Sequence, residues 1–122
     1  MNNIKKFNGS RQKVVFDSMT LANYPGGVII DNVDAKARFT DGIIPAGAVV
    51  VPSDGKFKIV NADLTATNIK GAIGLVLQDV AIEDFTQSSV VMDATVRIVA
   101  LPDKEQAGAA LLAKELPSLK FI

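Results

Sequence analysis

The chain has 122 residues, of which 48% are hydrophobic, and this is enough for one domain with a buried core. It contains no cysteine and no histidine, which excludes disulfides, thiolate metal ligands, thiol nucleophiles and the usual general base at neutral pH. Thirteen basic residues balance thirteen acidic ones and tryptophan is absent, so the composition argues against a protein that binds nucleic acid.

The first 27 residues are predicted to form an N-terminal arm that precedes a single domain of residues 28–122. Residues 1–12 are polar, whereas residues 13–19 (KVVFDSM) are β-branched and aromatic, a composition that predicts a strand. The sequence NYPGG at 23–27 is typical of a turn and separates the arm from the domain. The N-terminus lacks the apolar region of a signal peptide and no run reaches membrane-spanning length, so we expect no membrane association and synthesis in a cytoplasm.

Two stretches alternate between apolar and polar residues, as a strand with one exposed face does. In residues 33–39 (VDAKARF) the predicted exposed face carries Asp34, Lys36 and Arg38. Residues 90–101 repeat the pattern over a longer stretch, with one face made of Val90, Met92, Ala94, Val96, Ile98 and Ala100. These apolar side chains fill either the core of the domain or a contact between subunits.

Residues 71–80 (GAIGLVLQDV) contain an unbroken apolar run, which predicts a central strand buried on both faces. Gly74 inside this run indicates a bulge or a close approach of another backbone. Residues 102–117 have early acidic residues and helical apolar spacing, so they predict one helix, weakened by Gly108 and stopped by Pro117. The last residues, SLKFI, predict a short terminal strand.

Residues 42–60 (GIIPAGAVVVPSDGKFKIV) combine glycines with a lysine, as a phosphate-binding loop does. Such a loop needs four residues between its first glycine and a Gly-Lys pair, followed by Ser or Thr. Here seven residues separate Gly47 from Gly55 and Lys56, and Phe57 follows. A hairpin explains the pattern instead, with AVVV as one strand, PSDG as the turn and KFKIV as the return strand.

Acidic residues offer the remaining route to catalysis or metal binding, and the candidates are Asp31, Asp34, Asp79, Glu83 and Asp84. A catalytic pair needs a cleft and environments that push two pKa values apart, while calcium needs oxygen ligands at short alternating spacing. The first two candidates lie on or beside an exposed strand face and the others in a predicted loop, so we interpret all five as solvated acids. The sequence therefore predicts no catalytic residue, no metal site and no cofactor, and hence not an enzyme.

Five motifs follow one another along residues 40–122: IIPAGAVVV, GKFKIVN, AIGLVLQDV, VVMDATVRIVALPDK and, after a helix, LPSLKFI. In this order they resemble the head decoration and head-fibre proteins of tailed bacteriophages, which are auxiliary capsid proteins. In that family a Pro-Ala-Gly turn opens a hairpin, a Gly-Leu strand ends in an acidic residue and valine, and a strand, an alanine-rich helix and a last hydrophobic strand follow. Arg97 departs from the family, where many members have glycine after the long strand, and residues 1–39 show no clear match.

The resemblance implies a mostly β (α+β) protein: a small tulip-like or barrel-like β domain with one C-terminal helix and a final short strand. It implies a structural virion protein without catalytic chemistry, located on the capsid exterior and bound to the major capsid protein. It also implies a homo-oligomer, commonly a trimer. The alternative function is a non-catalytic protein-interaction module or a subunit of an enzyme complex.

The strand predicted in the arm lies outside the part of the chain that resembles the family. An extended segment can add to the edge of a partner's sheet, where backbone hydrogen bonds give affinity and alternate side chains give specificity. We therefore predict that Val14 and Phe16 face a partner, that Val15 points away or inward, and that Lys13 makes a contact at the rim. The alternative is that this strand completes the domain's own sheet.

Overall fold

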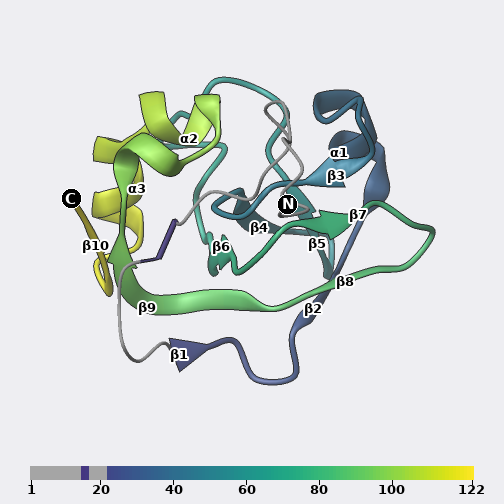
Figure 1. Ribbon diagram of the computed structural model, residues 1–122, viewed down its shortest axis with the longest axis horizontal. Coiled ribbons are helices and arrows are strands. Elements are labelled where there is room, and N and C mark those ends of the chain that lie inside the picture. Colours follow the sequence, from purple (N-terminus) through teal and green to yellow (C-terminus); the bar gives the residue numbers. More distant parts are fainter. Residues whose placement is uncertain (1–14, 17–21) are drawn as a thin grey trace, which may run out of the picture.

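The computed structural model describes residues 15, 16 and 22–122, and this part of the chain is mostly β (Figure 1). The strands of the main sheet are β1 (Ala22–Asn23), β2 (Val28–Ile30), β4 (Val49–Ser53), β5 (Lys56–Ile59), β6 (Gly74–Val76), β8 (Thr86–Ser88), β9 (Val90–Val96) and β10 (Leu119–Phe121). Their order is β1-β9-β6-β4-β5-β2-β8, and β10 pairs parallel to β9. A separate antiparallel pair joins β3 (Ile43–Ile44) to β7 (Val80–Ala81).

The main sheet closes on itself because each of its two end strands is continuous with another strand of the sheet. β1 leads through a turn into β2, and β8 leads directly into β9. Residues 22–30 therefore run antiparallel to residues 86–93, with Ala22 opposite Asp93 and Ile30 opposite Thr86. This circuit of paired strands confirms the prediction of a mostly β, barrel-like domain.

The central strands are buried on both faces, because two apolar clusters lie on opposite sides of them. On β4, Val49 and Val51 belong to one cluster and Val50 to the other, and on β6 Leu75 and Val76 divide in the same way. The barrel core consists of Val28, Ile30, Ala35, Ile44, Ala48, Val50, Ile59, Val76 and Val90. The helix-side core consists of Val15, Ala46, Val49, Val51, Val60, Leu64, Ile69, Leu75, Val91, Ala94, Val96, Leu101, Leu112, Leu116 and Leu119. This arrangement confirms the prediction that residues 71–80 contain a strand buried on both faces.

Gly74 lies where β6 passes close to β9. A Cβ atom at this position would lie 2.2 Å from the backbone oxygen of Val91, a separation that no side chain tolerates. The predicted close approach of another backbone is therefore confirmed.

The hairpin predicted around residues 49–59 is formed by β4 and β5, with the turn one residue later than expected. Asp54 and Gly55 both have positive φ, 50° and 79°, as the two central residues of a type I′ turn require. Pro52 and Ser53 belong to β4 and pair with Phe57 and Lys56. The structure thus has a hairpin where the sequence excluded a phosphate-binding loop.

The prediction of a strand at residues 33–39 is wrong, because the chain forms the helix α1 (Asn32–Arg38) there. The Asp31 carboxylate accepts a hydrogen bond from the backbone N–H of Val33 at 3.4 Å and so caps the helix. Ala35 is buried and Phe39, four residues later, packs against the same core, whereas Val33 is 68% exposed. Over only seven residues, an alternating pattern fits both a strand with one buried face and a short helix with one buried face. The capping hydrogen bond of Asp31 favours the helix.

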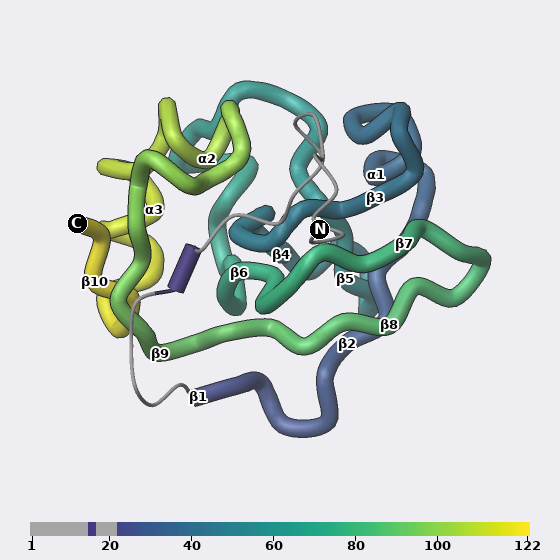
Figure 2. Tube along the Cα trace, viewed as in Figure 1, coloured from purple at the N-terminus to yellow at the C-terminus, as the bar shows by residue number. Residues whose placement is uncertain are grey.

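The single helix predicted at residues 102–117 is interrupted at Gly108. It is present as α2 (Asp103–Ala107) and α3 (Ala109–Glu115), and the expected terminal strand follows as β10. Figure 2 shows α2, α3 and β10 gathered at the left of the view and α1 at the right. A Cβ atom on Gly108 would lie 2.7 Å from Cδ1 of Leu64, so this glycine allows the helical segment to pack closely.

The strand predicted at residues 90–101 is correct only as far as Val96, where β9 ends; the 3₁₀-helix η1 (Ile98–Ala100) follows. The alternation also fails at the start, because Val90 and Val91 are both fully buried while Met92 is 37% exposed. Val90 lies in the barrel core and Val91 in the helix-side core. Val90 and Val96 therefore fill the domain's own core.

Candidate functional site

The described residues of the arm lie against β9 of the same domain. The backbone carbonyl of Val15 accepts a hydrogen bond from the N–H of Arg97 at 2.7 Å, and Phe16 forms an antiparallel bridge with Val96. Val15 is buried, and Phe16 is half-buried against the helix-side core. Of the other two residues predicted to bind a partner, Lys13 and Val14 both lie outside the described part of the chain.

The acidic residues considered for catalysis each have a separate local role or lie exposed. Asp31 caps α1, Asp34 lies 3.7 Å from the Lys58 ammonium, and Asp79 accepts the N–H of Ala46 at 2.8 Å. Glu83 and Asp84 lie exposed in the loop between β7 and β8. Among residues 15–16 and 22–122, no group of three or more potential ligand side chains could hold a metal ion.

A buried ion pair joins α1 to α2. Glu105 is fully buried, and both of its carboxylate oxygens accept hydrogen bonds from the Arg38 guanidinium, one of them at 2.8 Å. The same carboxylate accepts the backbone N–H of Val49 at 3.0 Å, and Arg38 also donates to the carbonyl of Val60 at 3.1 Å. Arg38 was predicted on an exposed strand face, but only 4% of its side chain is accessible. The pair holds α1, α2 and β4 together.

The acidic neighbours of Arg38 favour its charged form. Burial lowers the pKa of Arg38, but the hydrogen bonds and negative charges of Glu105 and Asp103 raise that pKa above its ordinary value. Slight burial works to raise the pKa of Asp103, yet the backbone N–H of Lys104 and the Arg38 guanidinium lower it on balance. Because Glu105 has no accessible surface, it holds the fold together and cannot meet a substrate.

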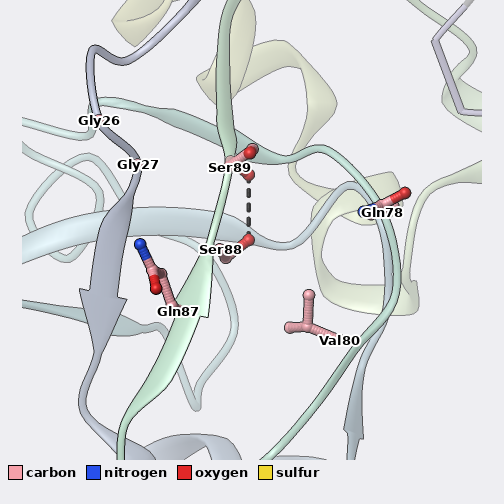
Figure 3. A pocket seen from close by; sticks show the side chains of 7 residues that line it. All are labelled: Gly26, Gly27, Gln78, Val80, Gln87, Ser88 and Ser89. Atoms are coloured by element: carbon pink, nitrogen blue, oxygen red, sulfur yellow. Dashed lines mark hydrogen bonds between the residues drawn. The ribbon is translucent and has the colours of Figure 1, made fainter.

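One shallow hollow, with a volume of about 270 Å³, lies between the turn before β2 and the loop around β7 and β8 (Figure 3). It is lined by Gly26, Gly27, Gln78, Val80, Gln87, Ser88 and Ser89. The Ser88 hydroxyl donates a hydrogen bond to the backbone carbonyl of Ser89 at 3.0 Å. The lining contains hydroxyl and amide groups and no charged side chain, so it offers neutral hydrogen bonds and no acid–base chemistry.

A larger groove, with a volume of about 480 Å³, opens between β2 and the start of β5. This β2–β5 groove is lined by Gly27, Val28, Ile29, Ile30, Asp31, Asn32, Gly55, Lys56, Phe57, Asp84 and Phe85. β2 and β5 run parallel and are paired at one position, Ile30 with Phe57. The groove therefore lies where these two strands of the barrel wall separate.

Two large apolar side chains of the groove face solvent. Phe85 is 78% exposed and Ile29 is 56% exposed. Asp31, Asp84 and Lys56 add charge at the same place. Exposed apolar side chains beside backbone of a separated strand pair are typical of a surface that binds an extended segment.

Neither the groove nor the buried ion pair is predicted by the sequence pattern. Phe85 lies in the mostly polar stretch IEDFTQ. A single aromatic residue in a loop between two strands can indicate an exposed contact residue, and this is the signal that the sequence offers for the groove. Glu105 carried no comparable signal, because an acidic residue in the first turn of a helix is ordinary.

Comparison of the chain with protein-family models, with curated proteins and with solved structures gives no match. Among the described residues, no helix is both long enough and apolar enough to cross a membrane.

Proposed function

We propose that this protein is a structural component of a tailed-phage particle, an auxiliary capsid protein that binds the outside of the assembled shell. The observation that carries the proposal is the order of motifs along residues 40–122, which resembles head decoration and head-fibre proteins. The elements along this stretch support it: a hairpin, a buried Gly-Leu strand, a long strand, an alanine-rich helical segment and a last strand follow in that order.

The side-chain chemistry also supports a binding role. The buried pair of Arg38 and Glu105 holds the fold together, and the remaining acidic candidates cap a helix, pair with lysine, bind backbone or lie exposed. The proposed partner is the major capsid protein, and the proposed assembly is a homo-oligomer, a trimer by the resemblance.

Mass spectrometry of purified particles tests the proposal. Virions of a phage that encodes this chain should contain it at high copy number relative to the portal and tail proteins. Shells that lack the chain should bind the purified protein in co-sedimentation until a fixed stoichiometry is reached, and shells of an unrelated phage should not. Absence of the chain from virions would overturn the proposal.

The β2–β5 groove favours a second candidate, a non-catalytic interaction module that serves a complex other than a capsid. The genes beside its own distinguish the two functions. Capsid and portal genes as neighbours support the virion protein, whereas genes of a metabolic complex support the interaction module.

A further inference from the structure

The outer edge of β8 borders the shallow hollow of about 270 Å³ described above. β8 pairs with β2 on one side, and within the described part of the chain no strand pairs with its other side. Figure 3 shows Ser88 and Ser89 at the middle of the hollow and Val80 across from them. The free edge of a strand carries backbone N–H and C=O groups with which another chain can pair.

The hydrogen bonds of β2 show which backbone groups of β8 face the hollow. The Asp31 N–H donates to the Phe57 carbonyl at 2.8 Å, so the odd-numbered residues at β2 direct their backbone groups toward β5. The even-numbered residues then face β8, which makes Val28 and Ser88 a hydrogen-bonded pair. Because successive residues of a strand alternate, the N–H and C=O of Gln87 point away from β2 and toward the hollow.

A ladder between this edge and the segment after β6 begins but does not continue. The Leu77 N–H donates to the Ser89 carbonyl at 3.0 Å, and a regular antiparallel ladder would next pair Asp79 with Gln87. Instead, the Asp79 carboxylate accepts the N–H of Ala46, and β7 pairs with β3. Among the described residues, the backbone N–H and C=O of Gln87 consequently have no hydrogen-bond partner.

The chemistry and size of the hollow define what fits there. One residue of a second extended segment supplies a C=O and an N–H at the spacing that the N–H and C=O of Gln87 require. No charged side chain lines the hollow, so a charged ligand group would lose hydration without gaining a partner. An extended residue occupies roughly 160 Å³, from the rise per residue and the spacings of strands and sheets. The hollow of about 270 Å³ therefore takes one or two such residues.

We propose that the edge of β8 at Gln87 binds an extended segment of a partner protein by strand addition, with uncharged residues of that segment in the hollow. The Gln87 N–H donates to a carbonyl of the segment, and the Gln87 carbonyl accepts an N–H from it. This inference rests on the backbone geometry of the domain and does not depend on the proposed capsid function.

Amide hydrogen exchange of the isolated full-length protein gives the first test. The Gln87 amide should exchange much faster than the neighbouring Ser88 amide, which is paired with Val28 and serves as the matched control. Equal protection of the two amides would overturn the proposal, because the edge would then already be paired.

NMR titration of the isotope-labelled protein gives the second test. The probes are pools of acetylated and amidated pentapeptides at millimolar concentration, either wholly uncharged or with lysine or glutamate at the centre. At least one uncharged pool should shift the Gln87 amide resonance and slow its exchange, and the charged pools should bind about tenfold more weakly or less. Failure of every uncharged pool to shift Gln87 would overturn the proposal. So would a shift with N-acetylglucosamine alone, which would indicate a sugar site.

Three variants separate backbone pairing from side-chain contacts, with the best uncharged pool as the probe. Gln87→Ala keeps both backbone groups and should bind as the wild type does. Gln87→Pro removes the N–H at an edge position that tolerates proline, and it should raise the dissociation constant about tenfold. Ser89→Phe should also weaken binding, because it places a ring on a residue that lines the hollow.

Thermal melting shows which variants are folded. Equal binding by the folded Gln87→Pro and Gln87→Ala variants would overturn the proposal. Should Gln87→Pro fail to fold, unchanged binding by Ser89→Phe would overturn it.

Discussion

Arg38 and Glu105 come from distant parts of the chain and form a pair in which Glu105 is fully buried and Arg38 nearly so. Glu105→Gln should lower the free energy of unfolding by about 3 kcal/mol, because it leaves the Arg38 charge buried without its partner. Asp103→Asn is the matched control, since this carboxylate touches the same guanidinium but is 86% exposed. Urea titrations should show a small effect for the control and a large one for Glu105→Gln, and equal effects would contradict the assignment.

The lowered pKa of Asp103 predicts a pH dependence. A carboxyl group with a folded-state pKa below its unfolded value stabilises the fold above the unfolded pKa, and this contribution is lost as the pH falls through the folded value. The wild-type protein should therefore be more stable than Asp103→Asn at pH 6. The difference should disappear in strongly acidic buffer, as measured by thermal melting across a pH series. A difference that stays constant with pH would show that Arg38 does not sense this charge.

Glycine is required at positions 74 and 55 for different reasons: Gly74 has no space for a side chain, whereas Gly55 has positive φ. Gly74→Ala should lower the free energy of unfolding by about 3 kcal/mol or more, because its methyl group would collide with the Val91 backbone. Gly55→Asn should have an effect below about 1 kcal/mol, since asparagine tolerates positive φ and the space around Gly55 is open. Chemical denaturation of both variants measures the contrast. If the two substitutions cost the same, the close approach of β6 and β9 is not the constraint.

At the scale of elements, the break between α2 and α3 depends on contact with a loop. Gly108→Ala should destabilise the protein, although alanine favours a helix by about 1 kcal/mol, because its Cβ would collide with Leu64. In a Leu64→Gly background, which also removes the Cβ of residue 64 that would lie 2.8 Å away, the same substitution should be less destabilising. A double-mutant cycle from denaturant titrations measures this coupling, and additive effects would contradict it.

The elements differ in how well the sequence predicts them. The hairpin, the buried strand around Gly74 and the terminal strand carry local signals: turn residues, an unbroken apolar run and a β-prone end. The pattern at residues 33–39 is ambiguous because two alanines suit a helix and seven residues are too few to separate the two periods. The β2–β5 groove and the ion pair arise from residues distant in sequence, and only tertiary packing brings them together.

At the scale of the whole molecule, Val15 attaches the arm to the domain, because it is only 3% exposed and belongs to the helix-side core. Deletion of residues 1–12 should leave the melting temperature nearly unchanged. Deletion of residues 1–19 should lower it by several degrees, because it removes Val15 and the hydrogen bond from Arg97. Differential scanning calorimetry of the two truncated chains checks this, and equal melting temperatures would place the boundary elsewhere. The shorter deletion keeps Lys13, Val14 and Phe16, so only the longer deletion removes the residues predicted to contact a partner.

The closed circuit of strands has a consequence for synthesis on the ribosome. Residues 22–30 pair with residues 86–93, and β10 joins β9. A nascent chain therefore holds unpaired strand edges until residues 86–93 have emerged. Such high contact order slows folding and prolongs exposure of apolar strands to other chains. Yield in cells should consequently depend on temperature and chaperone supply more than the stability of the finished barrel would indicate.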